Sequence, residues 1–256
     1  GMGYPTTLGA YQVDFAAGNV DIAITKYDTS GTQRIYSTYL GGEYDELPHS
    51  MIVNSSEELF VFGTTGSADY PTTNNAFCGN FKGGPAINLS GIGVSFPLGS
   101  DLFVSKLDSE GGGLLASTFV GGSGNDGLNT SPKLKYNYAD EVRGEIEVDK
   151  NNNIYVATTT MSTDFPLANS FQPINNGGQE GCIVKMDGQL TSIVWSSYLG
   201  AERDDAIYSL AIDDNDIYVA GGTTSRFFPT TSNIYYFRHI SQLYYFHIAG
   251  SNLLFH

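Results

Sequence analysis

Acidic side chains recur after three similar glycine-containing segments, and they are the residues best suited to cation binding. The segments are residues 35–42 (IYSTYLGG), 115–122 (LASTFVGG) and 194–201 (VWSSYLGA). Aligning the segments on their glycines makes two positions of the following loops equivalent. The first loop position carries Asp45, Asn125 and Asp204, and the second loop position carries Glu46, Asp126 and Asp205. Hard cations such as calcium bind several carboxylate and carbonyl oxygens. These six residues are therefore the candidate metal ligands, with calcium as the candidate ion and no other cofactor expected.

Two simpler structures compete with a metal site. The acidic loops could be solvated, with their side chains capping their own backbone, and this interpretation is favoured. Residues 149–153 (DKNNN) also space oxygens as a calcium loop does, but the downstream glycine and bidentate glutamate are missing. We therefore expect an asparagine-rich hairpin turn there.

The sequence offers little for catalysis, so no catalytic residue is assigned. His49 is the only histidine inside the well-patterned repeats and is interpreted as a surface residue near Glu46. No Gly-x-Ser-x-Gly motif is present, and Cys78 and Cys182 are far apart in sequence. Cys182 is predicted to be a buried free thiol, and Trp195 to pack between repeats.

Each acidic loop follows a recurring hairpin. Strands that begin with an acid and carry a late lysine are expected at 21–28, 101–108 and 180–187, each followed by the glycine-pair strand. After the acidic loop come a short apolar strand (50–54, 144–149, 209–213) and a second strand (59–65, 154–158, 217–221). The threonine runs that end these second strands are interpreted as β-branched packing. Four antiparallel strands form one unit, which is the size of a propeller blade.

The middle unit is longer than the others because of two insertions, Cys78–Ser100 and Asn129–Asp140. One precedes a lysine strand and the other follows a glycine pair. Loops of an antiparallel meander alternate between the two ends of its sheet, so both insertions are expected at the same end. A scaffold with one binding side has this arrangement.

Composition argues against two kinds of partner. Asp and Glu total 27 against 12 Lys and Arg, a formal charge of −15. That charge repels a nucleic-acid backbone, and no apolar run is long enough to cross a bilayer. We therefore expect neither nucleic-acid binding nor membrane insertion.

The repeats predict a single domain over residues 1–256. Residues 232–256 have no acid and are interpreted as a degenerate or truncated last repeat, with a lysine-type strand from Leu243 to Ile248 and a further strand start over Gly250–Phe255. The fold class is then an all-β propeller of about three and a half four-stranded blades, an incomplete ring. The open edges would belong to a fragment or pair with another copy.

The recurring phrases resemble the SBBP repeat, a seven-bladed β-propeller repeat family of bacteria. The similarity rests on the acid-led lysine strand, the YSTYLGG-type strand, the Val-Asp strand before a tight turn, and the aromatic-Pro-Thr-Thr phrase, as at 70–73 and 228–231. It covers roughly residues 4–235. The resemblance implies a propeller in secreted or surface proteins without an established catalytic role.

The predicted function is a non-enzymatic binding module of a secreted or cell-surface bacterial protein. Its acidic, insertion-bearing face would contact a protein or polysaccharide. One alternative is a carbohydrate-active enzyme that uses paired carboxylates on that face. Another is a calcium-stabilised adhesin module.

Overall fold

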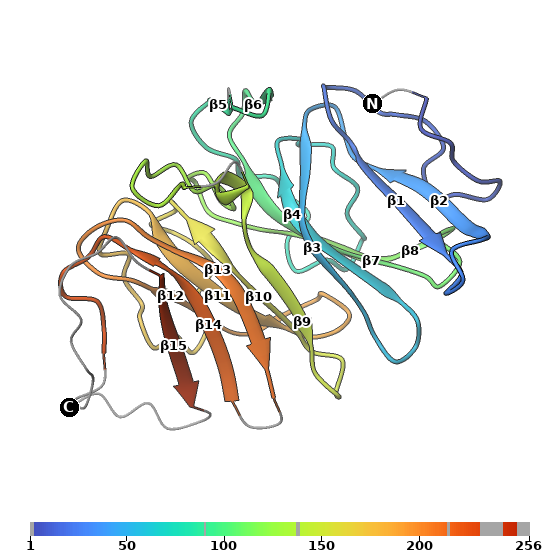
Figure 1. The fold of residues 1–256 in the computed structure, drawn as a ribbon. Helices are drawn as coiled ribbons and strands as arrows, with labels where there is room; N and C mark the ends of the chain where they lie inside the picture. Colours follow the sequence, from blue (N-terminus) through green and yellow to red (C-terminus); the bar gives the residue numbers. More distant parts are fainter. Residues whose placement is uncertain (1–2, 90, 137–138, 214–215, 231–242, 250–256) are drawn as a thin grey trace.

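The described part of the chain is all-β, built from small antiparallel sheets (Figure 1). The structure is a computed structural model, and it describes residues 3–89, 91–136, 139–213, 216–230 and 243–249. Its sheets follow one another along the chain in the orders β1-β2, β3-β4-β7-β8, β9-β10-β11-β12 (written from the first strand) and β13-β14-β15, with a separate hairpin β5-β6.

The strands have the following bounds. They are β1 Ile22–Tyr27, β2 Arg34–Leu40, β3 Glu46–Val53, β4 Leu59–Thr65, β5 Ile87–Leu89, β6 Val94–Phe96, β7 Asp101–Leu107, β8 Leu114–Val120, β9 Glu145–Val148, β10 Ile154–Thr160, β11 Glu180–Met186, β12 Ile193–Leu199, β13 Asp205–Ile212, β14 Asp216–Thr223 and β15 Leu243–Ala249. One short 3₁₀ helix, η1, covers Asp140–Val142.

The repeat alignment made from the sequence is confirmed by strand register. In each lysine strand the equivalent residue faces the equivalent aromatic of the glycine-pair strand, and the pairs are Ala23 with Tyr39, Phe103 with Phe119 and Cys182 with Tyr198. The all-β prediction and the four-strand antiparallel order are likewise confirmed. The described strands form separate sheets and no closed ring.

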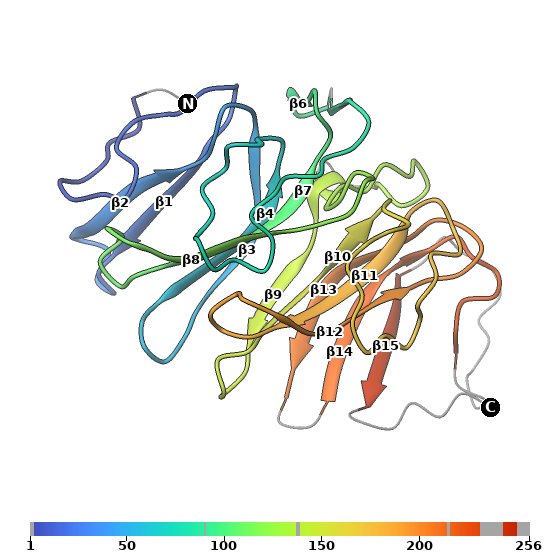
Figure 2. The same cartoon turned by 180° about the vertical axis from the view of Figure 1, so that it is seen from behind.

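Successive sheets pack face to face because their strands are apolar on both faces (Figure 2). In β4, Phe60 and Phe62 join a core shared with the β9–β12 sheet, whereas Leu59 and Val61 join the core shared with β1 and β2. This alternation follows the two-residue period of a strand. A third core joins the β9–β12 sheet to β13 and β14. The first strands also meet, β3 against β9 and β9 against β13.

Two of the predicted short strands start earlier than expected. Strand β3 begins at Glu46 and β13 at Asp205, so these acids open strands instead of lying within solvated loops. The burial of their side chains, described below, makes this extension of the ladder favourable.

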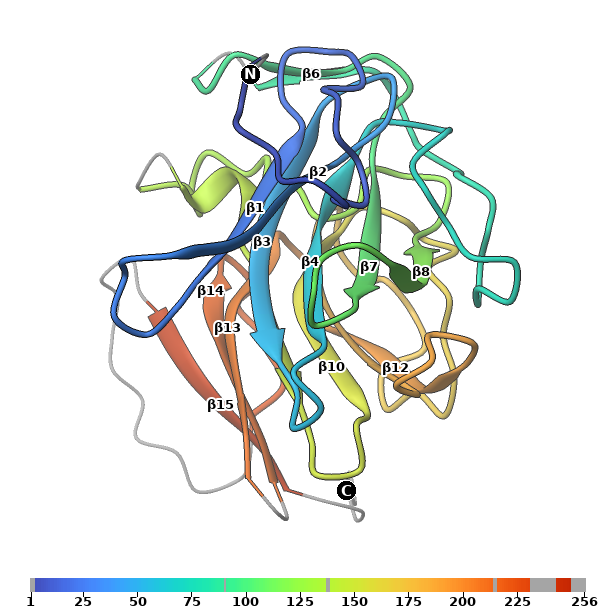
Figure 3. The ribbon, with the colours of Figure 1, turned by 90° about the vertical axis from the view of Figure 1, so that its right-hand side faces the viewer.

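The insertions carry structure that the sequence pattern did not predict. The first contains the hairpin β5-β6, whose Leu89, Val94 and Phe96 form a small core with Leu128. The second ends in η1. Both lie toward the end of the sheets where the acidic loops lie (Figure 3), as expected from the meander.

A strand near the end of the described chain and a buried free cysteine were both expected, and the structure contains both. Strand β15 pairs antiparallel with β14, so a strand forms where Leu243–Ile248 was expected to provide one. The expectation for Gly250–Phe255 lies outside the described residues. Cys78 and Cys182 are both free, and Cys182 is buried as predicted.

Candidate functional site

The acids at the second loop position are buried and cap the preceding glycine turn. Glu46, Asp126 and Asp205 are each no more than 1% exposed. Their carboxylates accept the backbone N–H of the turn residue four positions earlier: Glu46 from Gly42 at 3.0 Å, Asp126 from Gly122 at 2.9 Å, and Asp205 from Ala201 at 2.8 Å. The capping part of the expectation is confirmed, whereas the solvated part is wrong.

Hydroxyl groups from the end of the neighbouring strand complete each acid's environment. Thr65 and Ser67 donate to Glu46 at 2.8 and 2.5 Å. The second repeat has the same arrangement, with Thr160 and Ser162 donating to Asp126. In the third repeat, Ser225 donates to Asp205 at 2.9 Å.

Sequence reasoning missed these donors. The signal was a recurring Thr-x-Ser at 65–67, 160–162 and 223–225. The threonine runs were interpreted as packing residues, which is wrong for Thr65 and Thr160 because their hydroxyls bond buried carboxylates.

Burial dominates the protonation of these acids. It raises the pKa of Glu46 to about 7 and that of Asp126 to about 8, although the hydroxyl and amide donors oppose the rise. The pKa of Asp205 is also raised by burial. A carboxyl group removed from water favours its neutral form unless charge or hydrogen bonding compensates.

The residues at the first loop position fasten the loops and insertions that precede each lysine strand. Asp45 accepts the N–H groups of Asn19, Val20 and Ser95 at 2.5, 3.1 and 2.8 Å. Since Ser95 lies in β6, Asp45 ties the first insertion to the first acidic loop.

Asn125 has the same role at the second loop. It accepts the N–H of Ser100 and donates to the carbonyl of Pro85, both at 3.0 Å. The first insertion is therefore held at both of its neighbouring acidic loops.

Asp204, the third member, lines an open cleft. It accepts the hydroxyl of Ser131 in the second insertion at 2.8 Å. The cleft between that insertion and the third acidic loop measures about 490 Å³ and is lined by Ser131, Pro132, Lys133, Gly178, Glu202, Arg203, Asp204 and Thr224. Polar side chains therefore surround open space at this point of the insertion-bearing end.

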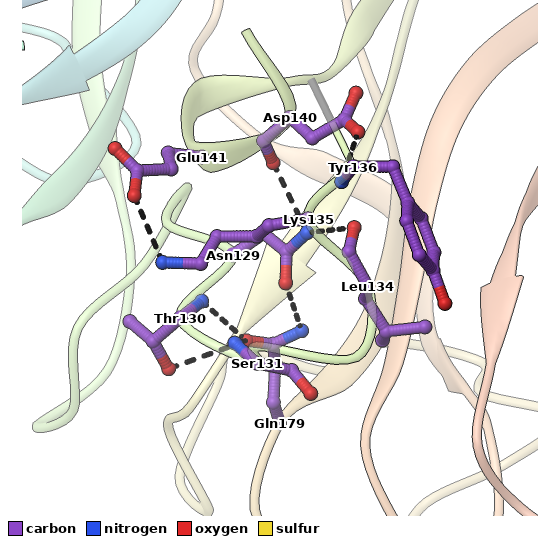
Figure 4. Close-up of polar contacts among 9 residues, drawn as sticks. All are labelled: Asn129, Thr130, Ser131, Leu134, Lys135, Tyr136, Asp140, Glu141 and Gln179. Atoms are coloured by element: carbon purple, nitrogen blue, oxygen red, sulfur yellow. Dashed lines mark hydrogen bonds and ion pairs between the residues drawn. The ribbon is translucent and has the colours of Figure 1, made fainter. Parts of the chain in front are cut away.

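A hydrogen-bond network fixes the second insertion that forms one wall of this cleft (Figure 4). Asn129 donates to the carbonyls of Leu134 and Asp140 at 2.9 and 3.0 Å. Gln179, which directly precedes β11, donates to Asn129 at 2.8 Å and accepts the Thr130 N–H at 2.7 Å. The wall is therefore fastened to the sheet by buried polar contacts.

An ion pair also stabilises the wall of the cleft that the second insertion forms. Lys135 and Glu141 form an ion pair at 2.8 Å, and the N–H of Tyr136 donates to Asp140 at 3.0 Å (Figure 4). These contacts hold Lys135 and Tyr136 against η1.

His49 is half-buried and is therefore less exposed than the predicted surface residue, and its ring nitrogens are enclosed. Its Nε2 bonds the Thr64 hydroxyl at 3.0 Å, its ring meets Phe62 edge-on with centroids 5.0 Å apart, and its Nδ1 is buried without a partner among the described residues. Burial lowers the pKa of His49 to about 3. A neutral, enclosed imidazole explains why the side chain does not pair with Glu46.

The remaining expectations at the loops agree with the structure. Asp149 accepts the N–H groups of Asn151 and Asn153 at 2.9 and 2.8 Å, as expected of a hairpin turn. Trp195 packs against the core between the second and third repeats.

The candidate metal ligands do not gather into one site. Within the described residues, no group of three or more His, Cys, Asp or Glu side chains is arranged to hold a metal ion. The six candidates lie in three separate loops, and protein donors approach each of them. Calcium binding there stays a prediction.

Comparison with known proteins identifies no family for this chain. Neither a scan against models of protein families nor a search of curated proteins finds a match. Among the described residues, no helix is long and apolar enough to cross a membrane. The resemblance to SBBP repeats therefore stays an expectation.

Proposed function

We propose that this chain is a non-enzymatic β-propeller scaffold of a secreted or cell-surface bacterial protein, and that it binds a glycan or protein at its insertion-bearing end. The observation that carries this proposal is the open cleft of about 490 Å³ between the second insertion and the third acidic loop. Successive four-stranded sheets with repeated register support the propeller part.

The chemistry of the cleft suits a polar polymer. Lys133 and Arg203 supply cationic donors, Glu202 and Asp204 supply acceptors, and hydroxyls come from Ser131 and Thr224. Sites that bind polar ligands combine a few placed hydrogen-bonding groups with apolar surface.

An exposed aromatic residue is bonded through its backbone N–H to a residue of the cleft. Glu202 accepts the N–H groups of Arg226 and Phe227 at 2.8 and 3.3 Å, and Phe227 is 81% exposed. An exposed ring beside hydrogen-bonding groups favours a sugar ring, which offers an apolar face and hydroxyl edges. This favours a glycan over a protein as the first partner to test.

Burial of the acids supports binding over hydrolysis. A glycosidase needs two carboxyl groups that reach the scissile bond, whereas Asp126 and Asp205 are 0% and 1% exposed. Their oxygens bond turn amides and strand hydroxyls, an arrangement suited to holding a loop. Of the two acids that line the cleft, Glu202 bonds the N–H groups of Arg226 and Phe227, and Asp204 bonds the hydroxyl of Ser131. The adhesin alternative differs from this proposal only in requiring calcium.

The first sheet has fewer strands than the two sheets that follow it. Among the described strands, β1 and β2 form a two-stranded sheet, whereas β3-β4-β7-β8 and β9-β10-β11-β12 have four strands each, so the edge of β1 is a place where strands are missing. We propose that this edge takes a further strand, from another copy or another part of the protein.

A glycan array tests the binding proposal. The chain should bind a subset of immobilised oligosaccharides, and Phe227→Ala and Arg203→Ala should each weaken that binding at least tenfold. Tyr27→Ala and Arg34→Ala are matched controls, because Tyr27 is 58% exposed and lies with Arg34 at the opposite end of the first hairpin. Loss of binding in the controls but not in the cleft variants would contradict the proposal.

A further inference from the structure

Three more acids are buried with one oxygen left without a partner. Asp21 and the residues that open β7 and β11, Asp101 and Glu180, are 5%, 1% and 0% exposed. One oxygen of each acid accepts a backbone N–H. The donor is Ala16 for Asp21 at 2.7 Å, Lys82 for Asp101 at 2.6 Å, and Asn176 for Glu180 at 2.8 Å. The other oxygen is buried, and no hydrogen-bond partner of ordinary geometry is found for it among the described residues. The Gln172 side chain near Glu180 and the Gly83 N–H near Asp101 lower the pKa values of these acids, but burial outweighs them.

Each unpartnered oxygen points to the same place as a loop acid. A Cβ added to Gly121 would lie within 2.6 Å of both Asp101 Oδ1 and Asp126 Oδ2. These two oxygens are therefore at most twice that distance apart.

The other two repeats share this geometry. A Cβ on Gly41 would lie within 2.8 Å of Asp21 Oδ1 and Glu46 Oε2. A Cβ on Gly200 would lie within 2.6 Å of Glu180 Oε2 and Asp205 Oδ2. The glycine ahead of each turn leaves open the space that the two carboxyl groups border.

Two ionised carboxylates this close and this buried would repel one another strongly. A proton on one of them removes the repulsion and supplies the missing donor, because a protonated carboxyl donates one O–H bond. We propose that each pair, Asp21 with Glu46, Asp101 with Asp126 and Glu180 with Asp205, holds one shared proton that locks the glycine turn of its repeat.

The groups that face the pairs favour protonation. The first pair is faced by Asp45 and Tyr70, the second by Asp164, Cys182, Tyr198 and Lys82, and the third by Glu202. Among the described residues that face the pairs, Lys82 alone is a cation, and its Nζ also donates to the Gly121 carbonyl at 3.0 Å.

The pKa values agree with this geometry. Burial, with a smaller contribution from the partner acid, raises the pKa of Asp126 and of Glu180 to about 8. Burial raises that of Asp101 only to about 6, where backbone donors and Lys82 oppose the rise.

The shared proton makes the free energy of unfolding decrease as the pH rises, whereas in acid unfolding it decreases as the pH falls. In the unfolded chain these carboxyls lose their protons near pH 4. Between that pH and the higher folded pKa, the folded state binds more protons than the unfolded state. The unfolding equilibrium constant should then rise with pH by about tenfold per unit for each pair. The protein should be most stable in mildly acidic solution.

Asp101→Asn tests one pair directly. The amide carbonyl can accept the Lys82 N–H while the NH₂ group donates to Asp126, which replaces the shared proton permanently. Urea unfolding from pH 5 to 8 should then show a slope lower than that of the parent by about tenfold per pH unit. Glu43→Gln is the control, since Glu43 lies exposed in an equivalent acidic loop and should leave the slope unchanged. An unchanged slope in Asp101→Asn would overturn the proposal.

Two further measurements distinguish the proton from other occupants. The infrared carbonyl band of protonated carboxyls should be present in the folded protein at pH 6 and reduced in Asp21→Asn, Asp101→Asn and Glu180→Gln. Any of these three variants that folds provides the test. Stabilisation at pH 8 by millimolar calcium, lost in Asp101→Asn, would overturn the proposal by making a cation the occupant.

Discussion

Replacing Thr160 by valine should destabilise the protein, whereas the same change at its neighbour should not. Thr160 and Thr159 are 0% and 1% exposed and adjacent in β10. The hydroxyl of Thr160 donates to Asp126 and accepts the Ser162 N–H at 2.9 Å. The hydroxyl of Thr159 is buried, and no partner is found for it among the described residues.

The magnitude follows from the bonds lost. Because the pKa of Asp126 is raised to about 8, its carboxyl group is mostly neutral at pH 6. Each of the two bonds lost then contributes about 1 kcal/mol, so Thr160→Val should lower the free energy of unfolding by about 1–3 kcal/mol. Thr159→Val removes a desolvated hydroxyl and should leave stability unchanged or raise it by up to about 1 kcal/mol.

Urea unfolding at pH 6 measures both variants. Valine keeps the shape and β-branching of threonine, so packing is matched between the two changes. Equal losses in the two variants, or a larger loss in Thr159→Val, would refute the assignment of Thr160 as the donor that holds Asp126.

Three other predictions follow from the same contacts. Gly121→Ala should lower the free energy of unfolding by about 1–3 kcal/mol, because the added Cβ would lie within 2.6 Å of oxygens of Asp101 and Asp126. In the control Gly79→Ala, the nearest atom is 3.7 Å from the added Cβ, so this change should be nearly neutral. Equal losses of stability in thermal melts of the two variants would contradict this prediction. The imidazole of His49, with a pKa lowered to about 3 by burial, should show no NMR titration between about pH 5 and 8, and a midpoint near its ordinary value of 6.5 would disprove its enclosure. Because the shift is downward, this histidine adds stability as pH rises from its folded pKa toward 6.5. Calcium at millimolar concentration should give no larger rise in Tm than magnesium, since protein donors already approach Asp45, Glu46, Asn125, Asp126, Asp204 and Asp205. A calcium-specific rise of several degrees would show instead that the folded protein binds calcium.

Repetition made the strand order predictable from the sequence. Because the phrases recur in the same order, Cys182 could be aligned with Ala23 and Phe103, and the register confirms this alignment. The β5-β6 hairpin was not predicted because the first insertion occurs in only one repeat.

The environment of the acids was harder to predict. Loop position suggested solvent, but whether Asp126 is buried depends on Asp101 and Thr160, which are 25 and 34 positions away in sequence. Such contacts depend on how strands stack, which local pattern does not specify. His49 was misjudged for the same reason, since Phe62 and Thr64 enclose it from the neighbouring strand.

Carbon-13 NMR titration of the side-chain carboxyls is the most direct test of the account, which holds that the recurring acids are internal, proton-binding parts of each repeat. It predicts midpoints near 7 for Glu46 and near 8 for Asp126 and Glu180, with Asp28, whose turn amides lower its pKa, titrating below its ordinary range. Midpoints near 4 for all of these groups would mean that the loop acids are solvated and would contradict the account.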